Sequence, residues 1–486
     1  MNQQLIVVSN RLPITIDQDG DEWQIKPASG GLVTALDPLM RQNHGTWIGW
    51  PGCGPEAPFD DLANRFSAEH GYRIKAVPLS EIEVEKYYRG FSNEALWPLF
   101  HDLLGNCNFN LDNYRSYDIV NRRFAEVAGE ASQANDIIWF HDYQLMLSGY
   151  YLRQTHPDRR LAFFLHIPFP SPDLLRRLPW SYDLLRGLFA YDLIGFQTLR
   201  DHRNFIHCVT SFIEGVDVVS RQSRLTVLRY GGRYIKVGNF PISIDFKRFS
   251  QDAGSDEVAE AARDLNESYG RRQLFLGIDR LDYTKGIPDR FFAFERALEK
   301  YPQMHQKASL LQVVVPSRTM VPDYIDLKSQ LEQLAGHING RFSEHGWVPL
   351  HYHYRSLDSI QLLAHYRAAK IALVTPLRDG MNLVAKEFCA CTNDNQGILI
   401  LSKFAGAADQ LGKYALLVNP YDIEKTADTI YQAFCMSESE QFWRMTALRG
   451  QIRRNDVHLW LKTFIAALNR DSEEAKKISS PLADKI

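Results

Sequence analysis

Short, continuously apolar runs alternate with longer amphipathic segments along this chain, and that alternation constrains its fold more than any other feature. The apolar runs form two series, at 5–9, 137–140, 162–165 and 193–196, and then at 274–277, 312–315, 371–375, 398–401 and 415–418. Runs that are apolar throughout indicate strands buried on both faces, as in a parallel sheet covered by helices. Helical patterns lie between them, for example at 289–300, 322–335 and 357–369. We therefore predict an α/β fold.

The two series of predicted strands are separated by a segment rich in turn-forming residues, GNFPISIDFKRFS at 238–250. A chain of 486 residues is also too long for one ordinary domain. We predict two Rossmann-like, doubly wound parallel-sheet domains that face a cleft, at 1–240 and 241–455, followed by an amphipathic helix and a charged tail at 456–486. Ligands should bind at the carboxyl ends of the strands.

Charge and cysteine content exclude several classes of function. The chain carries 55 basic and 58 acidic residues with no basic block, which argues against a nucleic-acid binder. Its six cysteines form no Cys-x-x-Cys pair, which is typical of reduced thiols. The first residues run into a predicted strand without a leader, and no run of about 20 apolar residues occurs, so we expect a cytoplasmic protein without membrane contact.

Two tempting motifs carry little weight. Gly52-x-Gly54-x-x-Ala57 matches a dinucleotide fingerprint, but flanking prolines interrupt it and no buried strand precedes a helix there, which leaves an NAD-dependent oxidoreductase as a distant alternative. Asp17, Asp19 and Asp21 resemble the aspartates of a metal-binding EF-hand loop. The glycine and the glutamate that such a loop needs are absent at the required positions. We interpret this run as a hairpin with a tight turn at Asp19-Gly20.

The block GIDRLDYTKGI at 277–287 follows a buried strand and places Arg280 and Lys285 in a loop before a helix. Two cations at a strand's carboxyl end would stabilise the negative charge of a departing nucleotide diphosphate. The alternative is a solvated loop in which Asp282 pairs with Lys285.

The block TPLRDGMNLVAKEF at 375–388 also follows a buried strand. Gly380 would permit an unusual backbone turn near a ligand, and the helix that follows would offer free N–H groups to a phosphate. Glu387, further along that helix, could accept hydrogen bonds from ribose hydroxyls. The alternative is an ordinary strand-to-helix connection capped by Asp379.

Further candidates lie at the ends of predicted strands or beside them. Arg11 in VVSNRLP could reach a phosphate, and Gly30-Gly31 would let backbone approach a ligand. The others are His141 and Asp142 in IIWFHDYQ, His166 in FFLHIPFP, Tyr88 and Trp97 in YYRGFSNEALW, and Arg318 in VVVPSRTMVP. Each has an ordinary alternative, such as a packed core histidine, a core aromatic or a surface arginine.

Taken together, these blocks resemble the trehalose-phosphate synthase family. The motifs VVSNR, SGGL, W-x-G-W, FSN-x-x-LW, IIW-x-HDY, FFLHIPFP, RLDY-x-KG, PSR and LVTPLRDGMNLVAKE follow the family's order from residue 7 to 388. The motif LS-x-FAGAA at 401–408 extends the match. The resemblance implies the GT-B arrangement of two Rossmann-like domains, with the last helix crossing back to the N-terminal domain.

The resemblance also implies roles for individual residues. The donor, UDP-glucose or another nucleotide-diphosphate glucose, would be bound by Gly30, Gly31, Arg280, Lys285, Leu383, Val384, Ala385, Lys386 and Glu387. The acceptor, glucose 6-phosphate, would be bound by Arg11, Trp50, Tyr88, Trp97, Asp142 and Arg318. His166 and Asp379 would contact the transferred glucose. Arg280, Lys285, His166, Asp142 and Asp379 form the expected catalytic set.

The implied reaction retains the anomeric configuration and yields α,α-trehalose 6-phosphate and UDP. No residue is an obvious nucleophile, so we expect attack on the face that the diphosphate leaves, with a diphosphate oxygen taking the acceptor's proton. We expect no metal, no other cofactor and a homo-oligomer. Two alternatives stay open: a transferase for another phosphorylated acceptor such as glycerol 3-phosphate, and an inactive sugar-phosphate sensor. The insertion between Pro13 and Ser29 is longer than in the shortest bacterial members of the family, and it could alter the choice of acceptor.

Overall fold

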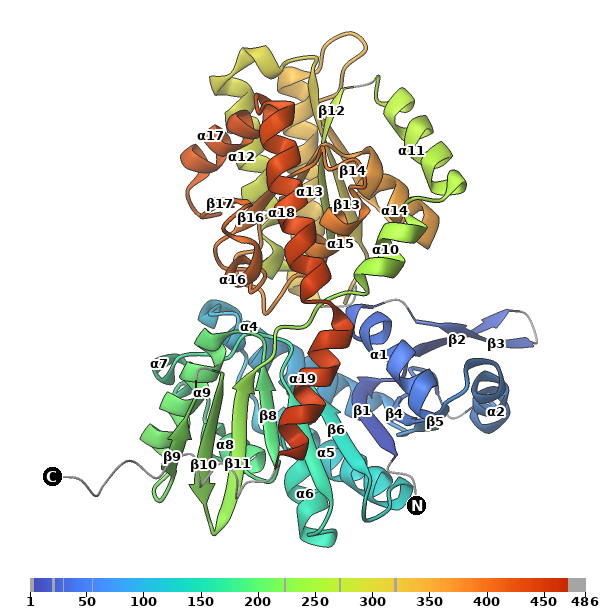
Figure 1. Cartoon of the computed structure of the whole chain (residues 1–486), viewed down its shortest axis with the longest axis vertical. Coiled ribbons are helices and arrows are strands. Elements are labelled where there is room, and N and C mark those ends of the chain that lie inside the picture. The colour runs from blue at the N-terminus through green and yellow to red at the C-terminus, as the bar shows by residue number, and fades with distance from the viewer. Residues whose placement is uncertain are drawn as a thin grey trace, which may run out of the picture. The chain divides into compact units, whose positions relative to one another are not determined.

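The chain forms two compact α/β units in a computed structural model (Figure 1). The structure describes residues 4–19, 22–28, 30–54, 56–222, 224–270, 272–318 and 321–470. One unit consists of Met1–Pro241 and Trp460–Ile486, and the other of Ile242–Leu459. Each unit has its own sheet and its own core, which confirms the α/β prediction. No helix among the described residues is long and apolar enough to span a membrane.

The first unit is built on a nine-stranded sheet. In spatial order its strands are β5 (Arg73–Ala76), β4 (Thr46–Trp50), β1 (Leu5–Arg11), β6 (Ile137–His141), β7 (Arg160–Phe164), β8 (Leu193–Phe196), β11 (Arg233–Asn239), β10 (Leu225–Tyr230) and β9 (Asp217–Arg221). The strands from β5 to β11 pair in parallel, whereas β10 is antiparallel to both of its neighbours. The predicted parallel sheet is thus confirmed from β5 to β11, and it carries an additional antiparallel edge whose partly exposed strands lack a continuous apolar run.

The first unit's helices lie between these strands. They include α1 (Gly31–Asn43), α2 (Phe59–His70), the π-helix η1 (Val84–Leu96), α4 (Trp97–Phe100), α5 (Leu111–Ala131), α6 (Ser148–Thr155), α8 (Ser181–Leu188) and α9 (Leu199–Phe212). A separate antiparallel hairpin joins β2 (Ile14–Asp19) and β3 (Glu22–Pro27), as predicted. Gly20 of the predicted turn lies outside the described residues.

The second unit is built on a six-stranded, wholly parallel sheet. In spatial order its strands are β14 (Leu350–Tyr354), β13 (Ala308–Val315), β12 (Gln273–Arg280), β15 (Ile371–Val374), β16 (Ile398–Ser402) and β17 (Leu416–Val418). Its helices are α10 (Phe246–Asp252), α11 (Asp256–Ser268), α12 (Ile287–Lys300), α13 (Pro322–Phe342), α14 (Ser359–Ala368), α15 (Leu383–Cys391), α16 (Ala408–Leu411), α17 (Ile423–Phe434) and α18 (Glu438–Arg454). The three helices predicted by periodicity are α12, α13 and α14.

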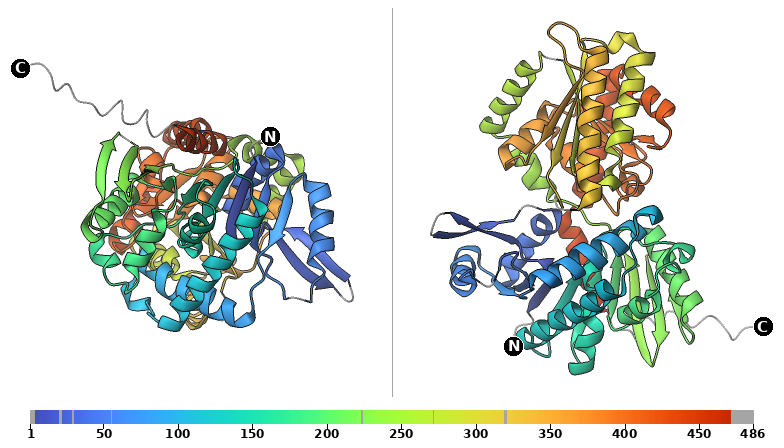
Figure 2. Two further views of the ribbon diagram at one scale, coloured as in Figure 1. Left: turned by 90° about the horizontal axis from the view of Figure 1, so that it is seen from below. Right: turned by 180° about the vertical axis from the view of Figure 1, so that it is seen from behind.

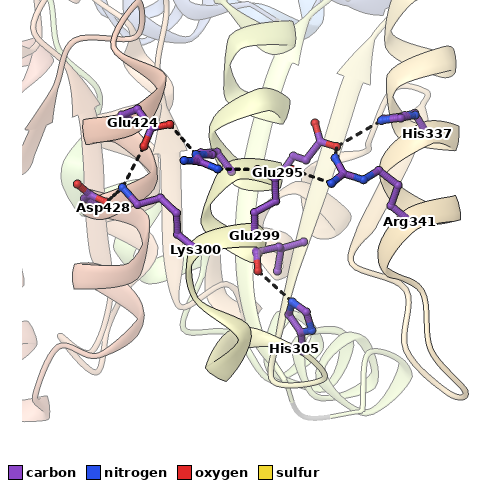
Figure 3. Close-up of polar contacts among 10 residues, drawn as sticks. Glu295, Glu299, Lys300, His305, His337, Arg341, Glu424 and Asp428 are labelled. Carbon is purple, nitrogen blue, oxygen red and sulfur yellow. Dashed lines mark hydrogen bonds and ion pairs between the residues drawn. The ribbon is translucent and has the colours of Figure 1, made fainter.

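Helices cover both faces of the second sheet, as continuously apolar strands require. Helices α14, α15 and α18 lie in front of the sheet in Figure 1, and α12 and α13 lie in front in the right-hand view of Figure 2. On the outer side of α12, α13 and α17, an ionic network joins the three helices (Figure 3). Glu299 accepts from Arg341 on α13 at 2.7 Å, and Glu424 on α17 accepts from Arg296 at 2.6 Å.

The last helix, α19 (Val457–Asn469), packs on the sheet of the first unit. The ring of Phe464 stacks on Trp139 of β6, with ring centroids 4.3 Å apart and planes 12° apart. Trp460 Nε1 donates to the carbonyl oxygen of Phe240 at 3.0 Å. The predicted C-terminal helix is thus confirmed, and the predicted charged tail after Arg470 lies outside the described residues.

This packing yields a first prediction about stability. Phe464 is fully buried, so Phe464→Ala should leave a cavity against Trp139 and lower the free energy of unfolding by about 3–5 kcal/mol. Lys462→Ala, at an exposed position of the same helix, is the control and should change it by less than about 0.5 kcal/mol. Urea unfolding followed by tryptophan fluorescence measures both. Equal losses in the two variants would contradict the proposed packing.

Candidate active site

The second unit gathers three cations around a buried carboxylate beyond the ends of β12 and β13. Asp282 is 2% exposed and follows β12, where its Oδ1 accepts hydrogen bonds from the backbone N and Oγ1 of Thr284 at 2.9 and 2.8 Å. Its Oδ2 lies 3.5 Å from Nη1 of Arg318. Burial alone would raise the pKa of Asp282, but the positive charges of Arg318, Lys285 and Arg280 outweigh it and lower that pKa.

The loop after β12 is shaped for this arrangement. Asp282 caps a short 3-10 turn, Tyr283–Lys285, and Gly286 begins the path into α12 with φ 60°. A Cβ on Gly286 would lie 2.7 Å from the carbonyl oxygen of Thr375, so glycine is required here by both conformation and space. The turn therefore brings Arg280 and Lys285 close enough to the buried Asp282 for their charges to lower its pKa.

Lys285 also joins this loop to the loop after β15. Its Nζ donates to Oδ2 of Asp379 at 2.6 Å, and both side chains are largely buried. The charge pair expected in the alternative interpretation was with Asp282. Because Lys285 reaches Asp379 instead, the two blocks singled out in the sequence meet in one place.

The helix predicted after the second block is α15, and its first turn borders Asp379. Asn382 caps it, accepting from the backbone N of Ala385 at 3.4 Å, so the alternative cap, Asp379, does not hold that position. Asn382 also has φ 75°, the left-handed backbone that was expected at Gly380. The backbone N–H groups at Leu383 and Val384 belong to the first turn of α15, which favours anions.

Two side chains on α15 have partners within the protein. Glu387 is partly exposed, and its Oε2 accepts from the hydroxyl of Tyr366 at 2.8 Å. Burial raises the pKa of Glu387, an effect that this hydrogen bond opposes. Lys386 is 1% exposed, and its ammonium donates to the Ile242 carbonyl oxygen and to Gln410 Oε1. Because the side chain of Lys386 is bound within the unit, only its backbone atoms remain for the expected contact with the nucleotide sugar.

The first unit gathers a second set at the ends of β1 and β4. Arg11 ends β1 opposite Trp50, and its guanidinium carbon lies 4.5 Å from the centroid of the Trp50 ring. The ring of Tyr88 lies 6.4 Å from that of Trp50. The guanidinium packs on Gly52, where φ is 83° and a Cβ would lie 2.4 Å from Nη2 of Arg11. Burial lowers the pKa of Arg11, while Tyr88 acts in the opposite direction.

The π-helix η1 and the turn after β6 hold Tyr88 and Trp97. Asn93 Nδ2 donates to the carbonyl oxygen of Tyr88 at 2.7 Å, and Asn93 Oδ1 accepts from the hydroxyl of Tyr143 at 2.8 Å. The Trp97 ring lies 5.7 Å from that of Tyr143, the residue after Asp142. A π-helix has no simple sequence signal, and such helices are frequent at functional sites.

Asp142 and His166 meet at the adjacent ends of β6 and β7. Oδ1 of Asp142 accepts from the backbone N of His166 at 3.1 Å, and Asp142 has φ 76°, which is strained for a residue with a side chain. Nε2 of His166 lies 3.0 Å from Nδ1 of His141, and its Nδ1 lies 3.5 Å from Gln197 Nε2. Burial lowers the pKa of His166 to about 3 and that of His141 well below its usual value, so both rings are neutral at neutral pH.

Two buried nitrogens of this set have no hydrogen-bond partner among the described residues. They are Nε1 of Trp50 and Nε2 of His141. A buried polar atom without a partner is costly, and in a site it is often completed by a ligand or a water molecule. We interpret Trp50 Nε1 as a donor available to an acceptor molecule.

Gly30 and Gly31 lie at the N-terminus of α1. Gly30 precedes the helix with an extended φ of 166°, and a Cβ there would meet nothing within 4 Å. Neither conformation nor packing within this unit therefore requires glycine at Gly30, and close approach of a ligand would be the reason for it. Ser29 of the same motif lies outside the described residues.

The structure thus divides the expected residues between two sets. The donor candidates on the loops of the second unit meet, and Arg318, expected at the acceptor, lies with them beside Asp282. Arg11, Trp50 and Tyr88 meet in the first unit. Sequence reasoning missed Asp282 as the organising acid, and also Tyr324, whose hydroxyl lies 3.3 Å from Oδ2 of Asp282 and bonds to Arg318. The signal for Asp282 was its place between two cations in RLDYTK.

No group of three or more His, Cys, Asp and Glu side chains suited to a metal ion occurs in the part of the chain that the structure describes. The charges that gather in each set belong to arginines, a lysine and single carboxylates. Such sets suit phosphorylated ligands and sugar hydroxyls.

Comparisons with known proteins agree with this chemistry. The family model described as glycosyltransferase family 20 matches residues 3–470. A trehalose-6-phosphate synthase of Mycolicibacterium gilvum is 41% identical over 470 residues, which cover 95% of this chain and 93% of that protein. A UDP-forming α,α-trehalose-phosphate synthase of Burkholderia xenovorans, solved in complex with glucose-6-phosphate, matches with a TM-score of 0.87 and 33% identity, covering 96% of this chain and all of that one.

A further solved structure, from E. coli and described as bound with UDP-2-fluoro glucose, matches with a TM-score of 0.85 and 35% identity over 96% of this chain and 99% of that one. The family match spans both units and both sets of candidate residues. This chain belongs to glycosyltransferase family 20.

Proposed function

We propose that this chain is a retaining glycosyltransferase that moves glucose from UDP-glucose to glucose 6-phosphate, giving α,α-trehalose 6-phosphate and UDP. The observation that carries the proposal is the group of three cations around Asp282, next to the anion-favouring first turn of α15. Relatives named as trehalose-6-phosphate synthases, and solved relatives with a UDP-glucose analogue or with glucose-6-phosphate, support the choice of both substrates.

In this proposal the second unit binds the donor. Arg280, Lys285 and the first turn of α15 hold the diphosphate, and Glu387 accepts from the ribose hydroxyls while Tyr366 orients its carboxylate. Leu383, Val384, Ala385 and Lys386 contribute backbone groups. Gly30 and Gly31 have no side chain beyond a hydrogen, so their backbone can lie close to the donor.

The acceptor is bound by the first unit's set together with Arg318. Arg11, Tyr88 and Arg318 take the phosphate of glucose 6-phosphate, and Trp50, Trp97 and Asp142 take its sugar ring. The unpartnered Nε1 of Trp50 supplies a donor for that ligand. His166 and Asp379 contact the transferred glucose. Nε2 of His166 faces His141, so only its Nδ1 can reach the glucose. Nδ1 must then replace its 3.5 Å contact with Gln197 by a contact with the sugar.

The chemistry follows from these charges. As the bond between glucose and the diphosphate breaks, negative charge grows on the diphosphate oxygen, and Arg280 and Lys285 stabilise it. The acceptor's anomeric hydroxyl attacks on the same face and gives its proton to that oxygen. Both His166 and His141 are neutral, so neither adds positive charge against the developing oxocarbenium ion.

The proposal is tested by measuring UDP release with several acceptors. UDP should form from UDP-glucose when glucose 6-phosphate is present, and proton NMR of the product should show two α-linked anomeric centres. Higher turnover with glycerol 3-phosphate would favour another transferase, and no UDP release with any acceptor would favour an inactive sensor. Either result would overturn the proposal.

Removing one donor cation should slow the reaction strongly. Arg280→Ala or Lys285→Ala should reduce kcat by on the order of 10²–10³-fold, because each cation stabilises charge that develops in the transition state. Lys425→Ala is the charge-matched control, since its side chain is 85% exposed on α17, and it should keep normal turnover. Near-normal kcat in either site variant would reject the assigned role.

Arg318 lies among the donor cations, and its proposed ligand is the acceptor phosphate, so its variant separates two interpretations. Arg318→Ala should raise the KM for glucose 6-phosphate by about 10- to 100-fold, the value of one hydrogen bond to a charged group. The KM for UDP-glucose should change by less than about threefold. An effect confined to the donor's KM would assign Arg318 to the diphosphate instead. Tyr324→Phe, which removes a hydroxyl bonded to Arg318, is the control for altered packing around Asp282.

A further inference from the structure

Lys386 is a buried charge on the proposed donor helix, and the reaction described above gives its ammonium no part. It belongs to α15, three residues after Leu383, and is 1% exposed. Burial lowers its pKa to about 7, because the protein interior solvates an ammonium group poorly. A methionine or leucine would fill the same space without that penalty. The charge is therefore retained against a local cost.

The partners of Lys386 come from two segments far away in the sequence. Its Nζ donates to the carbonyl oxygen of Ile242 at 2.6 Å and to Oε1 of Gln410 at 2.7 Å. Ile242 is the residue at which the chain enters the second unit, and Gln410 lies on the short helix α16. One side chain thus joins the donor helix to the entry segment and to α16.

The segment before α16 holds the donor loop from another direction. Backbone N–H groups of Gly406 and Ala407 donate to the carbonyl oxygens of Asp379 and Met381 at 3.1 and 2.8 Å. The backbone N of Asp379 donates to the carbonyl oxygen of Phe404 at 3.2 Å. This is the FAGAA part of the motif LS-x-FAGAA, which carries no side chain of the proposed site.

These contacts form one continuous support under the donor site. Segment 404–407 holds the loop 379–381, and Asp379 in that loop holds Lys285. The same segment continues into α16, and Gln410 of α16 holds Lys386. The loop 379–381 and the N-terminus of α15 are therefore held in position relative to each other by segment 404–410, and Lys386 makes the link from α15 to that segment.

We propose that Lys386 is a positioning residue for the nucleotide-sugar donor, because its buried ammonium fastens the first turns of α15 to Gln410 and to the backbone of Ile242. The proposal rests on the proposed function of α15 as the diphosphate-binding helix. Lys386 itself touches no substrate through its side chain, since that side chain is enclosed. Its effect reaches the donor through the position of the N–H groups at Leu383 and Val384.

Lys386→Met tests this directly, since methionine matches the length of lysine and has no hydrogen-bond donor. We expect the Kd for UDP, measured by titration calorimetry on the full chain, to rise on the order of 10-fold, the value of one charged hydrogen bond. The KM for UDP-glucose should rise with it, and the KM for glucose 6-phosphate should stay within about twofold of its original value.

The chain offers a matched control for the loss of a buried lysine. Lys236 is 4% exposed, and its Nζ donates to the carbonyl oxygens of Leu468 and Arg470 at 2.8 Å each. It lies in the first unit, outside both proposed substrate sets. Lys236→Met should lower the melting temperature as much as Lys386→Met does, without a change in the Kd for UDP. A general loss of stability would act equally in the two variants.

A second variant covers the case in which Lys386→Met does not fold. Gln410→Leu keeps the lysine and its bond to Ile242 but removes one acceptor, and it should raise the Kd for UDP by about threefold to fivefold. Unchanged UDP affinity in a folded Lys386→Met variant, or in Gln410→Leu, would overturn the positioning role. Failure of the unaltered protein to bind UDP would overturn the proposed function instead, so the two failures are distinguishable.

Discussion

The interaction on which the donor side of this structure depends is the buried carboxylate of Asp282 among three cations. Arg280, Lys285 and Arg318 come from two different loops, and like charges brought so close repel one another unless an acid lies between them. Asp282 supplies that acid, and hydrogen bonds from Thr284 hold it in one orientation. The cations are thus assembled before any ligand arrives, and little reorganisation is left for the moment of reaction.

Three residues of the proposed site regions have a strained backbone conformation. Asp142, Arg318 and Asn382 have φ values of 76°, 47° and 75°, although each carries a side chain. Such conformations cost about 1–3 kcal/mol each and persist where the surrounding contacts impose them. All three lie in loops between a strand and the next helix, and these loops carry or adjoin proposed substrate contacts. The strained backbone is therefore found in the connections that form the proposed site, between regular strands and helices.

Much of this molecule could be predicted from its sequence, because parallel strands buried on both faces leave continuous apolar runs. Every such run became a strand, and the loops after 274–277 and 371–375 meet through the ion pair of Lys285 with Asp379. The predicted runs did not include β4, β5, β9, β10, β11 and β14, because polar residues or glycine interrupt the apolar pattern of these strands. The homo-oligomer and the cytoplasmic location stay predictions, since residue types report neither.

Other features lay beyond sequence reasoning for physical reasons. The turn at Asn382 rather than Gly380 depends on how 404–407 holds the loop, which is a long-range backbone contact. The burial of Lys386 could not be read from VAKEF, where a lysine is ordinarily solvated. Arg318 belongs to the second unit by its place in the chain, and its contact with Asp282 accompanies a left-handed backbone, φ 47°, for which the sequence gives no signal.

The central claim is that Arg280 and Lys285, two of the three cations around Asp282, bind a diphosphate, and calorimetric titration with UDP and with uridine tests it most directly. The account predicts that UDP binds at least about 100-fold more tightly than uridine, as two charged contacts require, and that the difference shrinks by about 10-fold or more in Lys285→Ala. Equal affinity for UDP and uridine, or a difference that survives loss of Lys285, would contradict it.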